Sequence, residues 1–367
     1  MPEKRKKILK SLFSINVLLL FVPLAVYLEH FNPDRHTLIF FVACLGIIPL
    51  AGWMGHATEQ IANRAGEGVG GFLNATFGNA AELIIAIVAL RAGQIEIVKA
   101  SLTGSIIGNL LLVLGASFLA GGLFHKIQEY NPLSARAQAQ MLLLSSVALI
   151  VPALFHIVHV RGSTINEAAI SLWMAGLLIV VYFLSLLFSL KTHIHLFQTS
   201  REEEHHENGG KAWSLTLAVT ILALATVFIA WLAEILVGSV EAAAHSVGMS
   251  KIFVGIIIVA IIGNAAEHST AVVAALKNRM NLSLSIAIGS STQIALFVAP
   301  LLIFLSYALA PQPMDLVFSG GEVFAILIAA TLTAHITNDG HSHWFTGVLL
   351  IALYVILGVG FYFVPGG

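Results

Sequence analysis

The pentapeptide Gly78–Glu82 (GNAAE) recurs letter for letter as Gly263–Glu267, and each copy lies inside an apolar run long enough to cross a bilayer. A charged side chain at the centre of a bilayer costs roughly 2.5–3.5 kcal/mol on insertion scales. A chain that carries this cost twice, in the same local context, is expected to build one polar site at mid-depth from two related halves. This pattern is typical of membrane proteins with internal repeats.

Composition agrees with a membrane location. The chain is 58% hydrophobic and 10% charged, with a mean hydropathy of +0.91, whereas a soluble domain carries about 25% charged residues. We therefore expect lipid as a partner and no nucleic acid. The only cysteine, Cys44, excludes a disulfide within the chain.

Windows of mainly apolar residues, near the length of about 20 residues that crosses a bilayer as a helix, occur eleven times. The predicted fold class is an all-α polytopic membrane protein with eleven transmembrane helices. The fourth and ninth windows are long and contain glycine and serine, so we expect a break or a tilt there. The windows are Ser11–Leu28, Thr37–Gly55 (with a polar extension through Arg64), Phe72–Leu90, Ile95–Ala120, Ala137–Val158, Glu167–Leu190, Trp213–Val237, Ile252–Leu276, Leu282–Leu309, Phe318–Ile336 and Trp344–Val364.

One polar segment divides the chain. Residues 1–36 form a basic N-terminus and the first helix, residues 37–190 a first five-helix repeat, residues 191–212 an acidic, histidine-containing linker, and residues 213–367 a second five-helix repeat. An odd number of crossings per unit places the two copies in opposite orientations, so the repeats are predicted to be inverted.

The distribution of lysine and arginine orients the chain. With the N-terminus in the cytoplasm, thirteen basic residues fall on the cytoplasmic side and five on the other, as the positive-inside rule requires. The N-terminus and the acidic linker are therefore predicted to be cytoplasmic. The compact chain favours a prokaryotic cytoplasmic membrane, and a vacuolar membrane is the eukaryotic alternative.

The two halves align beyond the pentapeptide. A constant shift of 185 residues pairs identical residues at Ala86, Val88, Ala89, Gly104, Ser105, Leu111 and Val113, without a gap. Gene duplication explains this continuation better than chance.

Each half pairs a helix that carries asparagine and glutamate with a following helix that carries small polar residues. Asparagine and glutamate three residues apart project from one helical face, and a preceding glycine lets an ion or a neighbouring helix approach the backbone. The candidates for metal binding and proton exchange are Glu82 and Glu267. Their supporting ligands are Asn79, Asn264, Gly78 and Gly263. The polar lining from the second helix of each half is Ser105, Asn109, Ser290, Ser291 and Gln293.

This donor set consists of oxygen atoms, which hard cations such as Ca²⁺ prefer. Two carboxylates neutralise one divalent charge, and in the absence of a cation they repel each other, so that the empty pair favours protons. The sequence therefore predicts that Ca²⁺ and H⁺ compete for two glutamates at mid-membrane.

Other polar residues have two interpretations each. His268, Glu59 and Glu234 are candidates for proton relay or for an access path. An interior histidine with satisfied hydrogen bonds explains His268 equally well, and a solvated helix end is the simpler explanation of the two glutamates. The linker residues Glu202, Glu203, Glu204, His205 and His206 are candidates for regulation, although a solvated charge run is the more common meaning of such a segment.

The stretches GNAAELIIAIVAL, SLTGSIIGNLLLVLG and GNAAEHSTAVVAALKNRMNLSLSIAIGSSTQIALFVAP resemble the calcium/proton exchanger (cation/proton exchanger) family of the calcium/cation antiporter superfamily. The resemblance covers essentially the whole chain. It implies eleven spans, an acidic cytoplasmic segment after the sixth, and Ca²⁺ coordination by Glu82 and Glu267 with help from the asparagines and the glycine backbone. Gly108, which aligns with Gln293, departs from the hydroxyl residue that many relatives carry.

The expected function is thus secondary antiport of Ca²⁺ against H⁺ by alternating access, with both ions as substrates, no enzymatic activity and no cofactor. A Na⁺/Ca²⁺ exchanger of the same superfamily is the alternative. However, neither the fourth nor the ninth window carries the interior carboxylate that extra sodium sites would need. A homo-oligomer is left open by the sequence.

Overall fold

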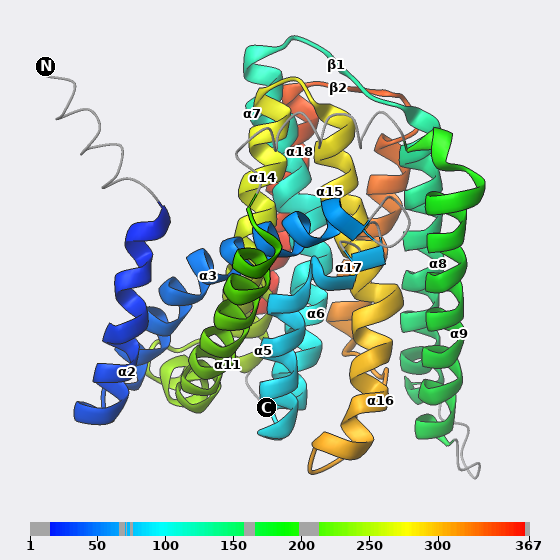
Figure 1. Cartoon of the computed structure of the whole chain (residues 1–367). Helices are drawn as coiled ribbons and strands as arrows, with labels where there is room; N and C mark the ends of the chain where they lie inside the picture. Colours follow the sequence, from blue (N-terminus) through cyan, green and yellow to red (C-terminus); the bar gives the residue numbers. More distant parts are fainter. Residues whose placement is uncertain are drawn as a thin grey trace, which may run out of the picture.

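The structure is a computed structural model that describes residues 15–65, 70, 72–73, 76–157, 166–197 and 213–363. The described part of the chain is almost entirely helical (Figure 1). Its elements are η1 (Ile15–Leu20), α2 (Phe21–Phe31), α3 (His36–Ala65), α5 (Ala80–Arg91), α6 (Ile95–Ile107), η2 (Gly108–Val113), α7 (Leu114–Phe124), β1 (Gln128–Glu129), α8 (Pro132–Ile157), α9 (Glu167–Leu187), η3 (Phe188–Thr192), η4 (Ile194–Leu196), α11 (Leu215–Ser246), α12 (Lys251–Phe253), η5 (Val254–Val259), α13 (Ala260–Gly263), α14 (Ala265–Leu276), α15 (Met280–Gln293), η6 (Ile294–Val298), α16 (Ala299–Leu309), α17 (Gly320–Ile336), β2 (His341–Ser342) and α18 (Trp344–Tyr362).

Within the described residues, seven helices are long and apolar enough to cross a membrane, or eight if a bent pair counts as one span. Shorter apolar helices cover Ile15–Phe31 and Gly320–Ile336. Helical residues occur in each of the predicted windows, but several boundaries differ. For example, α8 begins at Pro132, ahead of the predicted Ala137, because the Asn131 side chain accepts the backbone N–H groups of Leu133 (3.0 Å) and Ser134 (3.3 Å) and caps the helix there.

The helix breaks do not lie where the sequence placed them. The fourth and ninth windows are continuous helices that pass through the π-helical segments η2 and η6. The break is instead at the GNAAE motif: α13 and α14 meet at Asn264 with a bend of 62°. Asn264 (φ −93°, ψ 4°) and Asn79 (φ −94°, ψ 26°) share the same non-helical conformation. The repeated motif thus starts a new helix in both halves.

Two long helices and two edge helices frame the bundle. α3 packs along α11 with α2 beside them, and α8 packs against α9 at the opposite edge (Figure 1). The helices that carry the motifs, α5 and α14, and those that follow them, α6 and α15, lie between these edges. The candidate polar residues are therefore held in the interior of the bundle.

Glycines bring α6 and η5 into direct backbone contact. A Cβ atom on Gly104 would overlap the carbonyl group of Ile256, and one on Gly255 would lie 2.5 Å from Ala100 Cβ. The counterpart of Gly104 in the second half, Gly289, has only the Gln138 side chain near it, at 3.7 Å from such a Cβ. The two halves are therefore packed differently in this conformation.

A short antiparallel pair, β1 with β2, connects α7–α8 to α17–α18, with Gln128 opposite Ser342. Tyr130 follows β1, and its hydroxyl donates to the carbonyl oxygen of Ile336 at 3.1 Å. Burial, with a further contribution from the negative charge of Asp339, raises the pKa of Tyr130 to about 12.

We expect this tyrosine to make the fold sensitive to alkali. A tyrosine in the unfolded chain has a pKa of about 10, so with rising pH the unfolded chain loses this proton before the folded protein does. The contribution of the Tyr130 hydroxyl to the free energy of unfolding is therefore complete below about pH 10 and is lost as the pH rises to about 12. Tyr130→Phe should cost about 1 kcal/mol at neutral pH through the lost hydrogen bond. It should also show a smaller fall in melting temperature across this alkaline range. Thermal melts of the detergent-solubilised protein measure both effects, and parallel curves for the two proteins would contradict the assignment.

Candidate metal centre

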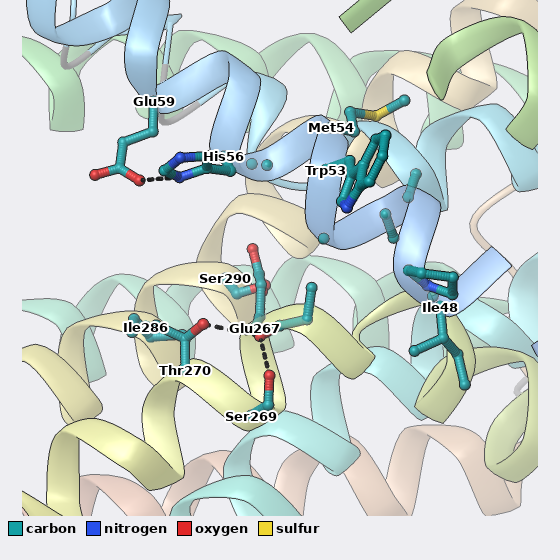
Figure 2. Close-up of a pocket in the computed structure, with 18 of the residues that line it drawn as sticks. Ile48, Trp53, Met54, His56, Glu59, Glu267, Ser269, Thr270, Ile286 and Ser290 are labelled. Atoms are coloured by element: carbon teal, nitrogen blue, oxygen red, sulfur yellow. Dashed lines mark hydrogen bonds and ion pairs between the residues drawn. The ribbon is translucent and has the colours of Figure 1, made fainter. Parts of the chain in front are cut away.

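A cavity of about 910 Å³ is lined by residues of both GNAAE motifs. Its walls come from α3, from the motif helices α5 and α14, and from α15. Glu82 and Glu267 both line it, as do Gly78 and Gly263. In Figure 2, Glu267 and Ser290 lie across the cavity from Trp53, His56 and Glu59 of α3.

The two glutamates occupy equivalent positions at the start of their helices. Glu82 lies in the first turn of α5 and Glu267 in the first turn of α14, where the N-terminal helix dipole favours an anion. Each has one buried oxygen, Glu82 Oε1 and Glu267 Oε2, that receives no hydrogen bond within the described residues. The two carboxylates are also close enough to interact through their charges. Because buried polar atoms are normally paired, these oxygens are suited to a cation.

Gly263 provides the space for this approach. A Cβ atom on Gly263 would come within 3.1 Å of Glu82 Cγ and 3.6 Å of its Oε1. The Glu82 side chain therefore lies against the backbone of the other motif, as expected from the glycine in GNAAE. The first motif's carboxylate and the second motif's backbone thus form one wall.

The motif asparagines are held by the helix of the opposite half. Asn264 Nδ2 donates to Ser105 Oγ at 2.9 Å and to the carbonyl oxygen of Ala260 at 2.9 Å. Asn79 Oδ1 accepts from Ser290 Oγ at 2.7 Å, and Asn79 Nδ2 donates to Gln293 Oε1 at 2.8 Å. Both asparagines are buried. These contacts fix the helix starts on which the glutamates sit.

The predicted polar lining divides into three groups. Ser290 and Gln293 line the cavity, and both hydrogen-bond the Asn79 side chain. Ser105 and Asn109 lie behind it and contact Asn264. Ser291 bonds the backbone carbonyls of Ile106 (3.3 Å) and Ala287 (3.0 Å), so it links α15 to α6 and is not a ligand candidate.

The mouth of the cavity contains residues that the sequence did not single out. His56 Nδ1 lies 3.6 Å from Glu59 Oε2, and the His56 ring packs edge-on against Trp213 at 4.6 Å. The backbone N–H of Trp213 donates to Gln60 Oε1 at 3.1 Å, and the Arg64 guanidinium donates to its carbonyl oxygen. The spacing of His56, Gln60 and Arg64 at four residues, on the polar end of an apolar helix, is the signal that could have revealed this face.

The remaining candidates lie elsewhere. Glu59 is at the mouth, but Glu234 lines a separate cavity of about 410 Å³ with Arg91 and Glu241. His268 bonds Asn109 and does not line the main cavity. The linker candidates Glu202, Glu203, Glu204, His205 and His206 lie outside the described residues.

Among the residues that the structure describes, no three His, Cys, Asp or Glu side chains gather around one point. The main site therefore offers two carboxylates supplemented by neutral oxygens. A cavity that reaches two buried glutamates, inside a bundle of membrane-length helices, defines a polytopic membrane protein of the cation-transporter class.

Comparisons with known proteins agree with this class. The family model described as sodium/calcium exchanger protein matches residues 35–191 and 217–363. The chain is 44% identical to a Ca(2+)/H(+) antiporter of Synechocystis sp., over 95% of this chain and 97% of that protein. It is 38% identical to the vacuolar calcium ion transporter of Schizosaccharomyces pombe, over 98% of this chain and 87% of that protein.

Solved structures give the same result. The structure of native YfkE superposes with a TM-score of 0.82 at 39% identity, over 96% of this chain and 100% of that one. The H+/Ca2+ exchanger CAX, at 15% identity, shares the fold with a TM-score of 0.67, over 97% of this chain and 89% of that one. The chain belongs to the sodium/calcium exchanger protein family and, within it, to the calcium/proton exchangers.

Proposed function

We propose that this protein is a secondary antiporter that exchanges Ca²⁺ for H⁺ across a membrane by alternating access, and that it is not an enzyme. The observation that carries the proposal is a pair of buried carboxylate oxygens, Glu82 Oε1 and Glu267 Oε2. They receive no hydrogen bond from the part of the chain that the structure describes, and both glutamates line one cavity. The names of the relatives support the same two substrates.

In this proposal the two glutamates bind either ion. Ca²⁺ takes six to eight oxygen ligands at flexible geometry, so two carboxylates, backbone oxygens near Gly78 and Gly263, and water supply the set. The amides of Asn79 and Asn264 support these ligands. When Ca²⁺ leaves, repulsion between the carboxylates favours protons in its place. Exchange is coupled because the doubly charged, empty pair is costly to carry through the membrane interior.

The proposed architecture has eleven spans, with residues 37–190 and 213–367 as inverted five-helix repeats. It is supported by the matched breaks at Asn79 and Asn264 and by the π-helical segments η2 and η6, which lie at positions related by the shift of 185 residues. Inverted repeats give alternating access when the two halves exchange conformations.

We further propose that this conformation is open toward the cytoplasm. The cavity reaches Trp213 and Glu59, at the end of the bundle next to the acidic linker, and that linker is predicted to be cytoplasmic. Across the site, α6 and η5 are in backbone contact and close the other path. The proposed membrane is a bacterial cytoplasmic membrane, and a vacuolar membrane, as in the name of the Schizosaccharomyces pombe relative, is the alternative.

The test is calcium uptake into proteoliposomes of the purified protein. An inside-acid gradient in sodium-free buffer should drive ⁴⁵Ca²⁺ uptake, and dissipating the gradient with a protonophore should stop it. Uptake that requires an inside-sodium gradient and ignores pH would instead identify a Na⁺/Ca²⁺ exchanger. Flux that follows voltage alone would indicate a channel and would reject both antiporters.

A further inference from the structure

Asn109 is a buried hub behind the cavity. It lies in the π-helical segment η2, is 1% exposed, and does not line the cavity. Its Nδ2 donates to Asn264 Oδ1 at 3.5 Å and to Ser290 Oγ at 3.1 Å, and its Oδ1 lies 3.1 Å from His268 Nε2. One side chain of the first half thus contacts three side chains of the second half.

A single backbone carbonyl sets the direction of this network. The Ala260 carbonyl oxygen can only accept, so Asn264 must present Nδ2 to it and Oδ1 to Asn109. Asn109 must then present Nδ2 to Asn264, which leaves its Oδ1 facing His268. His268 Nε2 therefore carries a hydrogen and donates it. The side chains of Asn264, Asn109 and His268 have no freedom to reverse.

The same direction continues into the cavity. Because Asn109 donates to Ser290 Oγ, the Ser290 hydroxyl donates its own hydrogen, and its acceptor is Asn79 Oδ1 at 2.7 Å. Ser290 therefore holds the Asn79 side chain, and Asn79 begins the helix α5 that carries Glu82.

The serine–asparagine hydrogen bond runs in the opposite direction in the other half. Ser105, the counterpart of Ser290, accepts from Asn264, the counterpart of Asn79. The hydrogen-bonded pair Asn109–His268 has no counterpart in the other half: the shift of 185 residues aligns Asn109 with Ile294 and His268 with Leu83. A hydrogen-bonded pair in one half is thus matched by two apolar residues in the other.

We propose that Asn109 is a positioning residue for cation binding, which acts through Ser290 to hold the Asn79 side chain and with it the start of α5, where Glu82 lies. His268 fixes Asn109 in turn. This inference rests on the proposed function, because it assigns the cavity glutamates to the transported Ca²⁺.

The test is equilibrium ⁴⁵Ca²⁺ binding to the purified, detergent-solubilised protein at fixed pH. Asn109→Ile, which copies the other half, should raise the Kd about tenfold, the effect of leaving one buried group unsatisfied. Ser290→Ala should raise it similarly, and the double variant should be no weaker than Ser290→Ala alone. A merely structural role for Asn109 would give effects that add, and an unchanged Kd in Asn109→Ile would overturn the inference.

His268 provides a second, milder test. His268→Gln keeps an N–H donor and should retain most of the affinity, whereas His268→Leu should lose it. Equal affinities in these two variants would contradict the network even if Asn109→Ile did not fold. Since binding is measured without a proton gradient, failure of proton-driven uptake would reject the proposed function separately.

Discussion

Glu267→Gln and Glu82→Gln should each abolish calcium uptake driven by a pH gradient. Each substitution keeps the shape of the side chain but removes the charge, so the cation loses a carboxylate in a buried site. Loss of one partner from a buried charge pair costs about 3–5 kcal/mol, which corresponds to a fall in calcium affinity of about 100-fold or more. Neither variant should lose stability, because each glutamate has a buried oxygen that no hydrogen bond from the described residues satisfies.

The matched control is Glu96→Gln. Glu96 also lies in the first turn of a helix, α6, but it is exposed and does not line the cavity. It should transport at the wild-type rate. Initial rates of ⁴⁵Ca²⁺ uptake in proteoliposomes, normalised to the inserted protein, measure all three variants. Uptake by Glu82→Gln or Glu267→Gln within a few-fold of wild type would remove these carboxylates from the site.

The helices and the central carboxylates could be predicted from the sequence because both depend on local properties. A run of apolar residues forms a helix in a membrane whatever surrounds it, and a carboxylate inside such a run needs a functional reason. Glu82 and Glu267 satisfied both criteria, and the structure places both on one cavity.

Features that depend on which helices pack together could not be predicted. A break or a tilt was expected in the fourth and ninth windows, since glycine and serine interrupt them, but both helices continue through π-helical turns without a break. The contacts of Trp213 with His56, Gln60 and Arg64 join residues about 150 positions apart in the sequence. Likewise, the different environments of Ser105 and Ser290 arise only when α6 and α15 meet the opposite motif.

Gly104→Ala should be the most damaging small substitution in the protein. The added methyl group would overlap the backbone of Ile256, which has no rotamer to relieve it, and overpacking of this kind costs about 1–3 kcal/mol. We expect a lower melting temperature and a loss of transport of at least about tenfold. The chemically identical change Gly289→Ala meets only the end of the Gln138 side chain at 3.7 Å. It should therefore fold normally, helped by the higher helix propensity of alanine.

The transport rate of Gly289→Ala tests alternating access directly. If the two halves exchange conformations, α15 must close against the first half as α6 now closes against η5, and Gly289 then takes the crowded position of Gly104. Gly289→Ala should consequently bind ⁴⁵Ca²⁺ with wild-type affinity in this open conformation yet exchange it slowly, because the opposite conformation is strained. A binding measurement in detergent beside an uptake measurement in proteoliposomes separates the two steps. If Gly289→Ala exchanged calcium at the wild-type rate while Gly104→Ala were inactive, the two halves would not exchange conformations during transport, and this alternating-access mechanism would be rejected.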